Sequence, residues 1–504
     1  MNLADKTIIN ILAKSGEAVL LLISSIVMVR YLNKEEYGTF LQIMLIMNTA
    51  VMFAYFGIPQ SIFYFLHKTD NKASFVLRNI VIACILGGGA ALAVFFLNDS
   101  LGQWLNNPLL HEYKYVVVAL VFLRGPVIMR DPLLISQGNL LLNSVASIVS
   151  NTLFYVPMIV AAFFSAGIAV LFNVLLIASV VDLLSFFVLM GWFVKHVNKD
   201  DHVTTDTRHV GLLEQLRYAF PIGISSYIGI VGRQIDQYIV SVFFTPQSFA
   251  VYSRGAMRVP VLSTIQFTVN DIMMPYYVKD YRDGKIKSLL SRYHLCVEKV
   301  AKINFPVFVF LFFASPSLIS LLYTEQYLGA VPVFRAYLFL LIINITTFGI
   351  IPRASGKTKS IFYASLINVV ANIILSCLLV PVFGAVGAAI ATILCAILSG
   401  YYYLIMSCRI LAIEMRQIFP WNFLARYLCI SLIAGIPIFI IDYITQLVGL
   451  HLLLTLSLEG IVYSLGFVVL VMRFDFLTAD DLNTLNRWLK INTEKWFRRV
   501  AFMK

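Results

Sequence analysis

The side chains best suited to do chemistry in this sequence are cations that lie inside long apolar runs. Those cations are Lys14, Arg124, Arg233, Arg254, Arg258, Lys302 and Arg335. A charged group at the centre of a bilayer costs at least about 2.5–3.5 kcal/mol on insertion scales, so it normally faces protein or a water-filled cavity. Lys302 is near enough to the end of its run to reach the surface. Because guanidinium and ammonium groups donate to phosphate oxygens, we expect the other six to bind an anionic substrate such as a diphosphate.

Arg254 and Arg258 form the strongest pair of candidates. They are four residues apart in the predicted span 249–278, which would place them on one face of a helix. With a rise of about 1.5 Å per residue, Arg258 would lie roughly 14 Å from the outer end of that helix. No acidic residue lies near them in the sequence, so a local ion pair does not account for them.

Two other cations have an acidic residue three positions further along the chain. Arg233 precedes Asp236, and Lys14 precedes Glu17. Residues at this spacing share a helix face and can form a local ion pair. The spacing leaves three interpretations open: a structural pair, a cation that binds substrate, or a carboxylate at Asp236 or Glu17 that binds a coupling ion.

The elements that must position these residues are apolar runs of membrane-spanning length. Of the 504 residues, 60% are hydrophobic and 13% are charged, whereas soluble domains carry about 25% charged residues. A helix needs roughly 20 apolar residues to cross a bilayer. The predicted spans are 8–30, 38–66, 75–97, 115–136, 140–163, 168–194, 218–243, 249–278, 296–323, 327–351, 359–380, 384–408, 424–445 and 449–472. The composition therefore predicts an all-α integral membrane protein with about 14 transmembrane helices.

The composition also excludes several functions. The six cysteines form no CxxC pair, and the sequence shows no His cluster, nucleotide-binding loop or nucleophile motif. We therefore expect no metal, no cofactor and no enzymatic activity. The net charge of +12 is distributed over loops and belongs to no soluble basic module, so nucleic acid is not expected as a partner.

Lys and Arg in the loops predict the orientation, because they are retained on the cytoplasmic side. With the N-terminus inside, 28 of them fall on the cytoplasmic side and three on the opposite side. Both ends of the chain are therefore expected in the cytoplasm.

The two halves of the sequence resemble each other. YLNKEEYGTF at 31–40 aligns without gaps with FFTPQSFAVY at 243–252, at an offset of 212. Weaker matches follow in the same order further along both halves. Six spans per half preserve the orientation of each half, which predicts two six-helix lobes related by a pseudo-two-fold axis along the membrane normal. The predicted parts are an N-terminal lobe (1–205), a C-terminal lobe (206–415), spans 13 and 14 (416–472) and a cytoplasmic amphipathic tail (473–504).

Several segments carry a family resemblance. They are Lys14-Ser15-Gly16, Arg30-Tyr31-Leu32, KEEYGTF from Lys34, FTPQSFAVYSRG from Phe244, YTEQYLGA from Tyr323 and VPVFGAVGAAIAT from Val380. Together they resemble the polysaccharide-repeat (O-antigen, Wzx-type) flippases of the multidrug/oligosaccharidyl-lipid/polysaccharide exporter superfamily. The resemblance implies a MATE-like fold. It also implies transport of an undecaprenyl-diphosphate-linked oligosaccharide across the bacterial cytoplasmic (inner) membrane, among membrane lipids and beside polysaccharide polymerase or assembly proteins.

Three alternatives stay open. A drug/cation antiporter of the same superfamily would use Asp236 or Glu17 as its ion site. A lipid II-type flippase would share the fold, but the opening lacks the Arg-rich first span associated with those proteins. A membrane-embedded glycosyltransferase or polymerase would need a large outer loop, and every predicted outer loop is short.

Overall fold

The computed structural model describes residues 3–164, 167–197, 210–357, 359–448, 450–474 and 476. At some positions within helices, Lys14 and Arg233 among them, it describes the backbone but not the side chain. Every described element of regular structure is an α-helix or a short 3₁₀ helix, so the predicted all-α class is confirmed.

Most of the predicted spans correspond to single long helices. These are α1 (Leu3–Tyr31), α4 (Lys72–Trp104), α8 (Leu140–Phe163), α9 (Gly167–His196), α10 (Leu212–Phe243), α17 (Lys359–Phe383), α18 (Ala385–Leu411), α19 (Trp421–Val448) and α20 (Leu452–Arg473). Within the described residues, nine helices are long and apolar enough to cross a membrane, or ten if one bent pair counts as a single span; this set includes Lys34–Tyr55 and Glu325–Ile343 but not α1 or α10. The chain is therefore a multi-pass membrane protein, and the total of 14 spans stays a prediction.

Five predicted spans are interrupted, and each consists of two or three shorter helices. Their parts are α2 (Lys34–Tyr55) and α3 (Ile58–Phe65); α6 (Lys114–Arg124), η1 (Pro126–Met129) and α7 (Arg130–Ser136); α11 (Pro246–Gly255) and α12 (Pro260–Arg282); α13 (Ile286–Phe313) and α14 (Ser315–Tyr323); and η2 (Glu325–Ala330), α15 (Val331–Ile343) and α16 (Ile350–Ala354). The bend between α13 and α14 is 74°.

Proline explains the position of these breaks. A proline lies among the first three residues of a helix that follows each break; these prolines are Pro59, Pro126, Pro260, Pro316 and Pro352. Proline has no backbone N–H and fixes φ near −65°, so it suits the first turn of a helix and disrupts a helix interior. The apolar runs therefore predict the membrane-spanning segments, and the prolines mark where five of these segments divide into separate helices.

The internal repeat appears in the helix ends. α1 ends at Tyr31 and α10 at Phe243, while α2 begins at Lys34 and α11 at Pro246, so both boundaries keep the offset of 212. Asn33 caps α2 through a reciprocal capping box: its Oδ1 accepts from the Glu36 backbone N–H at 2.8 Å, and Glu36 Oε2 accepts from the Asn33 N–H at 3.2 Å. Local sequence therefore sets the start of this helix.

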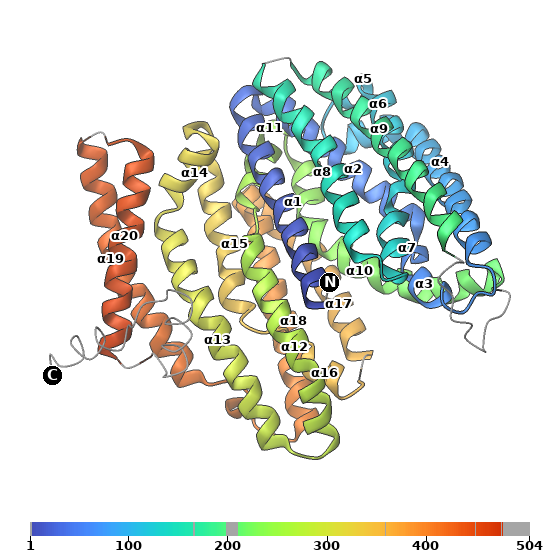
Figure 1. Cartoon of the computed structure of the whole chain (residues 1–504). Helices are drawn as coiled ribbons and strands as arrows, with labels where there is room; N and C mark the ends of the chain where they lie inside the picture. The colour runs from blue at the N-terminus through green and yellow to red at the C-terminus, as the bar shows by residue number, and fades with distance from the viewer. Residues whose placement is uncertain are drawn as a thin grey trace. The chain divides into compact units, whose positions relative to one another are not determined.

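The described helices group into two compact units. The first unit comprises 1–253 and 369–388, and the second comprises 254–368 and 389–504. Large aromatic side chains fill a core in each unit: Tyr55, Phe65, Phe186 and Phe193 in the first, and Tyr277, Tyr293, Phe305 and Phe419 in the second. In the second unit, α19 and α20 run side by side (Figure 1). The lobe boundaries predicted at 205/206 and 415/416 stay predictions.

Two predicted segments lie mostly or wholly outside the described residues. The polar stretch from Lys195 to Arg217 is described only at its two ends. Of the amphipathic tail predicted at 473–504, only 473, 474 and 476 are described.

Candidate functional site

The break between α11 and α12 carries Arg258, the leading candidate from the sequence. Residues 256–259 are not helical, and Arg258 is exposed within this segment. Val259 is extended, with φ −77° and ψ 103°, because a residue before proline is sterically excluded from the helical region. In a membrane protein, irregular backbone is tolerated only where it is buried in protein or lines a water-filled cavity. The break is therefore a suitable place for a side chain that meets a polar ligand.

This break corrects the expected relation between Arg254 and Arg258. Arg254 is in the last turn of α11, whereas Arg258 follows the end of that helix. The four-residue spacing places side chains on one face only when the helix is continuous. The two cations therefore belong to the same short region but do not share a helix face.

Arg254 is positioned by an aromatic residue of α14. Its guanidinium lies 5.7 Å from the centre of the Tyr323 ring, within cation–π range. Tyr323 is fully buried, and its hydroxyl donates to Met257 Sδ at 3.2 Å, which also fixes the break. A Cβ added to Gly255 would lie 2.6 Å from the Ala330 carbonyl oxygen, so only glycine permits this close approach to the η2–α15 segment.

A separate charged cluster lies in the first unit around Arg124. The Arg124 guanidinium Nη1 lies 3.6 Å from Asp182 Oδ2, and the group stacks 4.1 Å from the centre of the Phe154 ring. Ser150 donates a hydrogen bond of 2.8 Å to the same Asp182 oxygen. Glu17 on α1 is exposed and lies within electrostatic range of Arg124. Sequence analysis missed Asp182, although an acidic residue in the middle of the apolar run 168–194 was a usable signal.

Asp236 is buried in the first unit and bonded to an aromatic residue. Tyr252 Oη donates to Asp236 Oδ2 at 2.8 Å, and Tyr252 is itself buried. Tyr252 is the last residue of the repeated segment 243–252. The sequence did not predict that this residue would be the partner of Asp236. The Arg233 side chain lies outside the described part of the structure, as does that of Lys14. Their pairing with Asp236 and Glu17 stays a prediction.

Arg335 in the second unit engages the bend between α13 and α14. Its Nε donates to the Phe312 carbonyl at 3.0 Å and to Ser315 Oγ at 2.8 Å, and the guanidinium lies over the Phe312 ring. The last carbonyls of a helix lack partners within the helix, so a cation at this end is favourable. These contacts support a structural role, and a substrate role for Arg335 stays a prediction.

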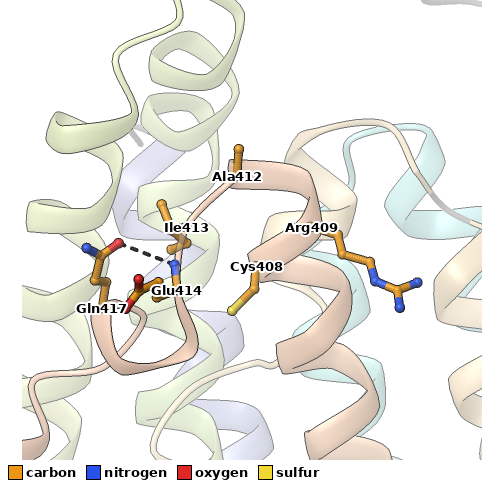
Figure 2. A pocket seen from close by; sticks show the side chains of 6 residues that line it. All are labelled: Cys408, Arg409, Ala412, Ile413, Glu414 and Gln417. Carbon is orange, nitrogen blue, oxygen red and sulfur yellow. Dashed lines mark hydrogen bonds between the residues drawn. The ribbon is translucent and has the colours of Figure 1, made fainter.

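A cavity of about 490 Å³ lies at the end of α18 and beside the short helix η3 (Met415–Gln417). Its lining residues are Cys408, Arg409, Ala412, Ile413, Glu414 and Gln417. The Arg409 guanidinium points away from the other labelled side chains (Figure 2). At the start of η3, the Glu414 backbone N–H donates to Gln417 Oε1 at 3.3 Å (Figure 2). With its one arginine turned away, this cavity is poorly suited to a diphosphate. Among the described residues, no three His, Cys, Asp or Glu side chains are placed to hold a metal ion.

Comparison with known proteins identifies the family. Residues 27–332 match the family described as polysaccharide biosynthesis protein. The chain belongs to this family. A relative in Methanocaldococcus jannaschii, the uncharacterized membrane protein MJ1068, is 26% identical over 408 residues, which cover 74% of this chain and 78% of the relative.

Two solved structures share the fold of this polysaccharide biosynthesis family member. The lipid II flippase MurJ in an inward closed conformation superposes with a TM-score of 0.70 at 17% identity, covering 93% of this chain and 98% of MurJ. An inward-facing multidrug resistance transporter of the MATE family superposes with a TM-score of 0.59 at 13% identity, covering 80% of this chain and 96% of the transporter. The MATE-like fold expected from the sequence is therefore confirmed.

Proposed function

We propose that this protein is a flippase for a lipid-linked oligosaccharide of the undecaprenyl diphosphate type. It moves this substrate by alternating access from the inner to the outer leaflet of the bacterial cytoplasmic membrane, without changing it chemically. The observation that carries the proposal is Arg258, an exposed cation on irregular backbone inside a run of membrane-spanning length. The family and the MATE-like fold support a transporter that serves polysaccharide synthesis.

The proposed mechanism divides the work between two cations. Arg258 is exposed in the break, so it would meet the diphosphate, whose oxygens accept the paired donors of a guanidinium. Arg254 is held by Tyr323 and would add positive potential without moving. Arg124 already faces Asp182 and would contribute only if the substrate competes with that carboxylate. Rocking of two lobes would then carry the bound headgroup across, with both chain ends in the cytoplasm.

Transport by purified protein tests this proposal directly. The protein is reconstituted into liposomes with a fluorescent undecaprenyl-diphosphate-linked oligosaccharide, and its appearance in the opposite leaflet is followed with a membrane-impermeant quencher. We expect faster exchange than in protein-free liposomes, and no comparable effect on an undecaprenyl chain that lacks the diphosphate. Equal rates for both lipids would contradict recognition through the diphosphate. Ion-driven export of an organic cation, with no lipid exchange, would instead support the drug/cation antiporter.

A further inference from the structure

A polar network inside the second unit involves side chains from four helices, and the proposed transport mechanism uses none of these side chains. Its members are Ser317 on α14, Arg335 on α15, Asp442 on α19 and Glu459 on α20. Ser317 Oγ lies 3.1 Å from Glu459 Oε1 and 3.4 Å from Asp442 Oδ1. α19 and α20 lie outside the predicted two-lobe repeat. The network therefore ties these two extra helices to the second unit.

These groups lie well within their helices. Glu459 is the eighth residue of α20, and Asp442 is the seventh from the end of α19. With a rise of about 1.5 Å per residue, both are roughly 10 Å from the nearer helix end. Glu459 is 0% exposed, whereas Asp442 is half-buried. An ionised carboxylate at such a depth is costly, so intramembrane acidic residues usually have a functional partner.

The number of donors and acceptors limits how many of these contacts can be hydrogen bonds when both carboxyl groups are ionised. A serine hydroxyl has one proton to donate and can accept from other groups. Ser317 can therefore donate to only one of the two carboxylates, and the other contact is a hydrogen bond only if that carboxyl carries its own proton. Glu459 Oε2 is fully buried and has no hydrogen-bond partner among the described residues. That environment is costly for a carboxylate oxygen but is tolerated by the carbonyl oxygen of a neutral acid.

Burial is the first reason to place the proton on Glu459, because this side chain is 0% exposed whereas Asp442 is half-buried. Arg335 lies within electrostatic range of Asp442, and a nearby cation stabilises a carboxylate. Asp442 in turn acts on Glu459, and the negative charge of Asp442 disfavours a second one. The other titratable group near Glu459 on α20 is Tyr463, one helical turn further on, whose hydroxyl has no described hydrogen-bond partner. Among the described residues, Glu459 forms no ion pair with a cation. Of the two carboxyls, the fully buried Glu459 is therefore the better holder of a proton.

We propose that Glu459, Ser317 and Asp442 form an intramembrane proton-binding site and relay. In the resting arrangement, the Glu459 O–H donates to Ser317 Oγ, and the Ser317 O–H donates to Asp442 Oδ1. Transfer breaks the Glu459 O–H bond while a new O–H bond forms on Ser317. The original Ser317 proton moves to Asp442, leaving a Glu459 carboxylate and a neutral Asp442. One proton moves from the fully buried carboxyl to the half-buried one, where it can exchange with water.

Infrared spectroscopy tests this assignment without any transport assay. A neutral carboxylic acid has a C=O stretch that is separate from carboxylate bands and shifts on transfer to D₂O. The full-length protein is measured in a detergent without ester groups, near neutral pH. We expect the wild type to show a carboxylic acid band that Glu459→Gln removes, because glutamine has the same shape but no acidic proton. Glu298→Gln on α13 is the matched control and should leave the band unchanged.

Two further variants test the relay itself. Ser317→Ala should keep the Glu459 band but shift it, because the acid loses its hydrogen-bond acceptor. Asp442→Asn should also keep the band, because Glu459 holds the proton in the resting arrangement. A wild-type spectrum without a carboxylic acid band, or a band that survives Glu459→Gln, would overturn the proposal. So would a band lost in Asp442→Asn but retained in Glu459→Gln. None of these outcomes depends on the identity of the transported lipid, so the proposed function is tested separately.

Discussion

Arg258 offers the sharpest test of how the protein recognises its substrate. A charge-assisted hydrogen bond contributes about 1.5–3 kcal/mol. Arg258 is exposed, so water competes for its donors and the lower end of this range applies. At 1.4 kcal/mol per factor of ten, Arg258→Gln should slow transport roughly tenfold. Arg258→Lys keeps the charge but loses the paired donors, so we expect roughly a threefold loss.

Charge reversal gives the largest expected effect. Arg258→Glu would place an anion where we propose that the diphosphate binds, so we expect no transport above background. The assay is surface glycan made by a flippase-null strain carrying each variant, normalised to the amount of protein in the membrane. Arg409→Glu is the matched control, because Arg409 is exposed in the same unit and points away from its neighbouring cavity (Figure 2). This control should retain wild-type glycan.

The ranking of variants separates the two transporter mechanisms. Recognition of a diphosphate predicts that Arg258→Glu is inactive. A drug/cation antiporter predicts that Asp236→Asn is inactive, while replacement of Arg258 is mild. Normal glycan from Arg258→Glu at normal abundance would refute the role of Arg258, and the cation would then be a structural charge.

Two further predictions concern stability. Asp182→Asn should destabilise the protein, because it leaves Arg124 without the carboxylate 3.6 Å away. Loss of one partner of a buried ion pair lowers the free energy of unfolding by up to about 3–5 kcal/mol. Because Arg124 is partly exposed, we expect a loss of roughly 1–3 kcal/mol. Arg124→Gln combined with Asp182→Asn should recover part of the loss in a thermal unfolding assay, and purely additive losses would mean that the pair is not coupled. Gly38→Ala should lower the folded yield, because the added Cβ would lie 1.9 Å from the Pro246 carbonyl oxygen. Gly191→Ala, with no atom within 4 Å of the added Cβ, is its control, and equal yields for both would contradict the packing argument.

The sequence predicts the described helices well where a span is a single apolar run. The predicted span 140–163 coincides with α8, and the repeat at an offset of 212 places the ends of α1 and α10. These features are local, because they depend on apolar length and on the residues that begin and end a helix. The sequence did not show which spans divide into separate helices, because a proline inside an apolar run does not reveal whether it kinks one helix or begins a second.

The side-chain partners were harder to predict for a different reason. Asp182 is distant in sequence from Arg124, and Glu459 is still further from Ser317. Such contacts depend on which helices pack together, and hydrophobic patterning does not specify this for helices that are apolar on every side. Spacing along the sequence suggested pairs within one helix, but it could not show contacts to other helices. The spacing showed that Asp236 could pair with Arg233 on its own helix. It did not indicate that the Tyr252 hydroxyl would donate a hydrogen bond to Asp236.

The two copies of the repeat differ at the position that Arg254 occupies. At the offset of 212, Arg254 corresponds to Gln42, which lies in α2 where that helix is unbroken. Gln42 is fully buried, and its Nε2 donates to the Leu105 carbonyl at 3.0 Å and to Ser241 Oγ at 2.6 Å. The first copy thus satisfies this position with neutral hydrogen bonds inside a packed helix. The second copy carries a cation at this position and ends the helix one residue later, leaving Arg258 exposed on irregular backbone. A scaffold that folds with a glutamine at this position does not need an arginine there for stability, which agrees with the proposal that the second-half cations bind an anionic substrate.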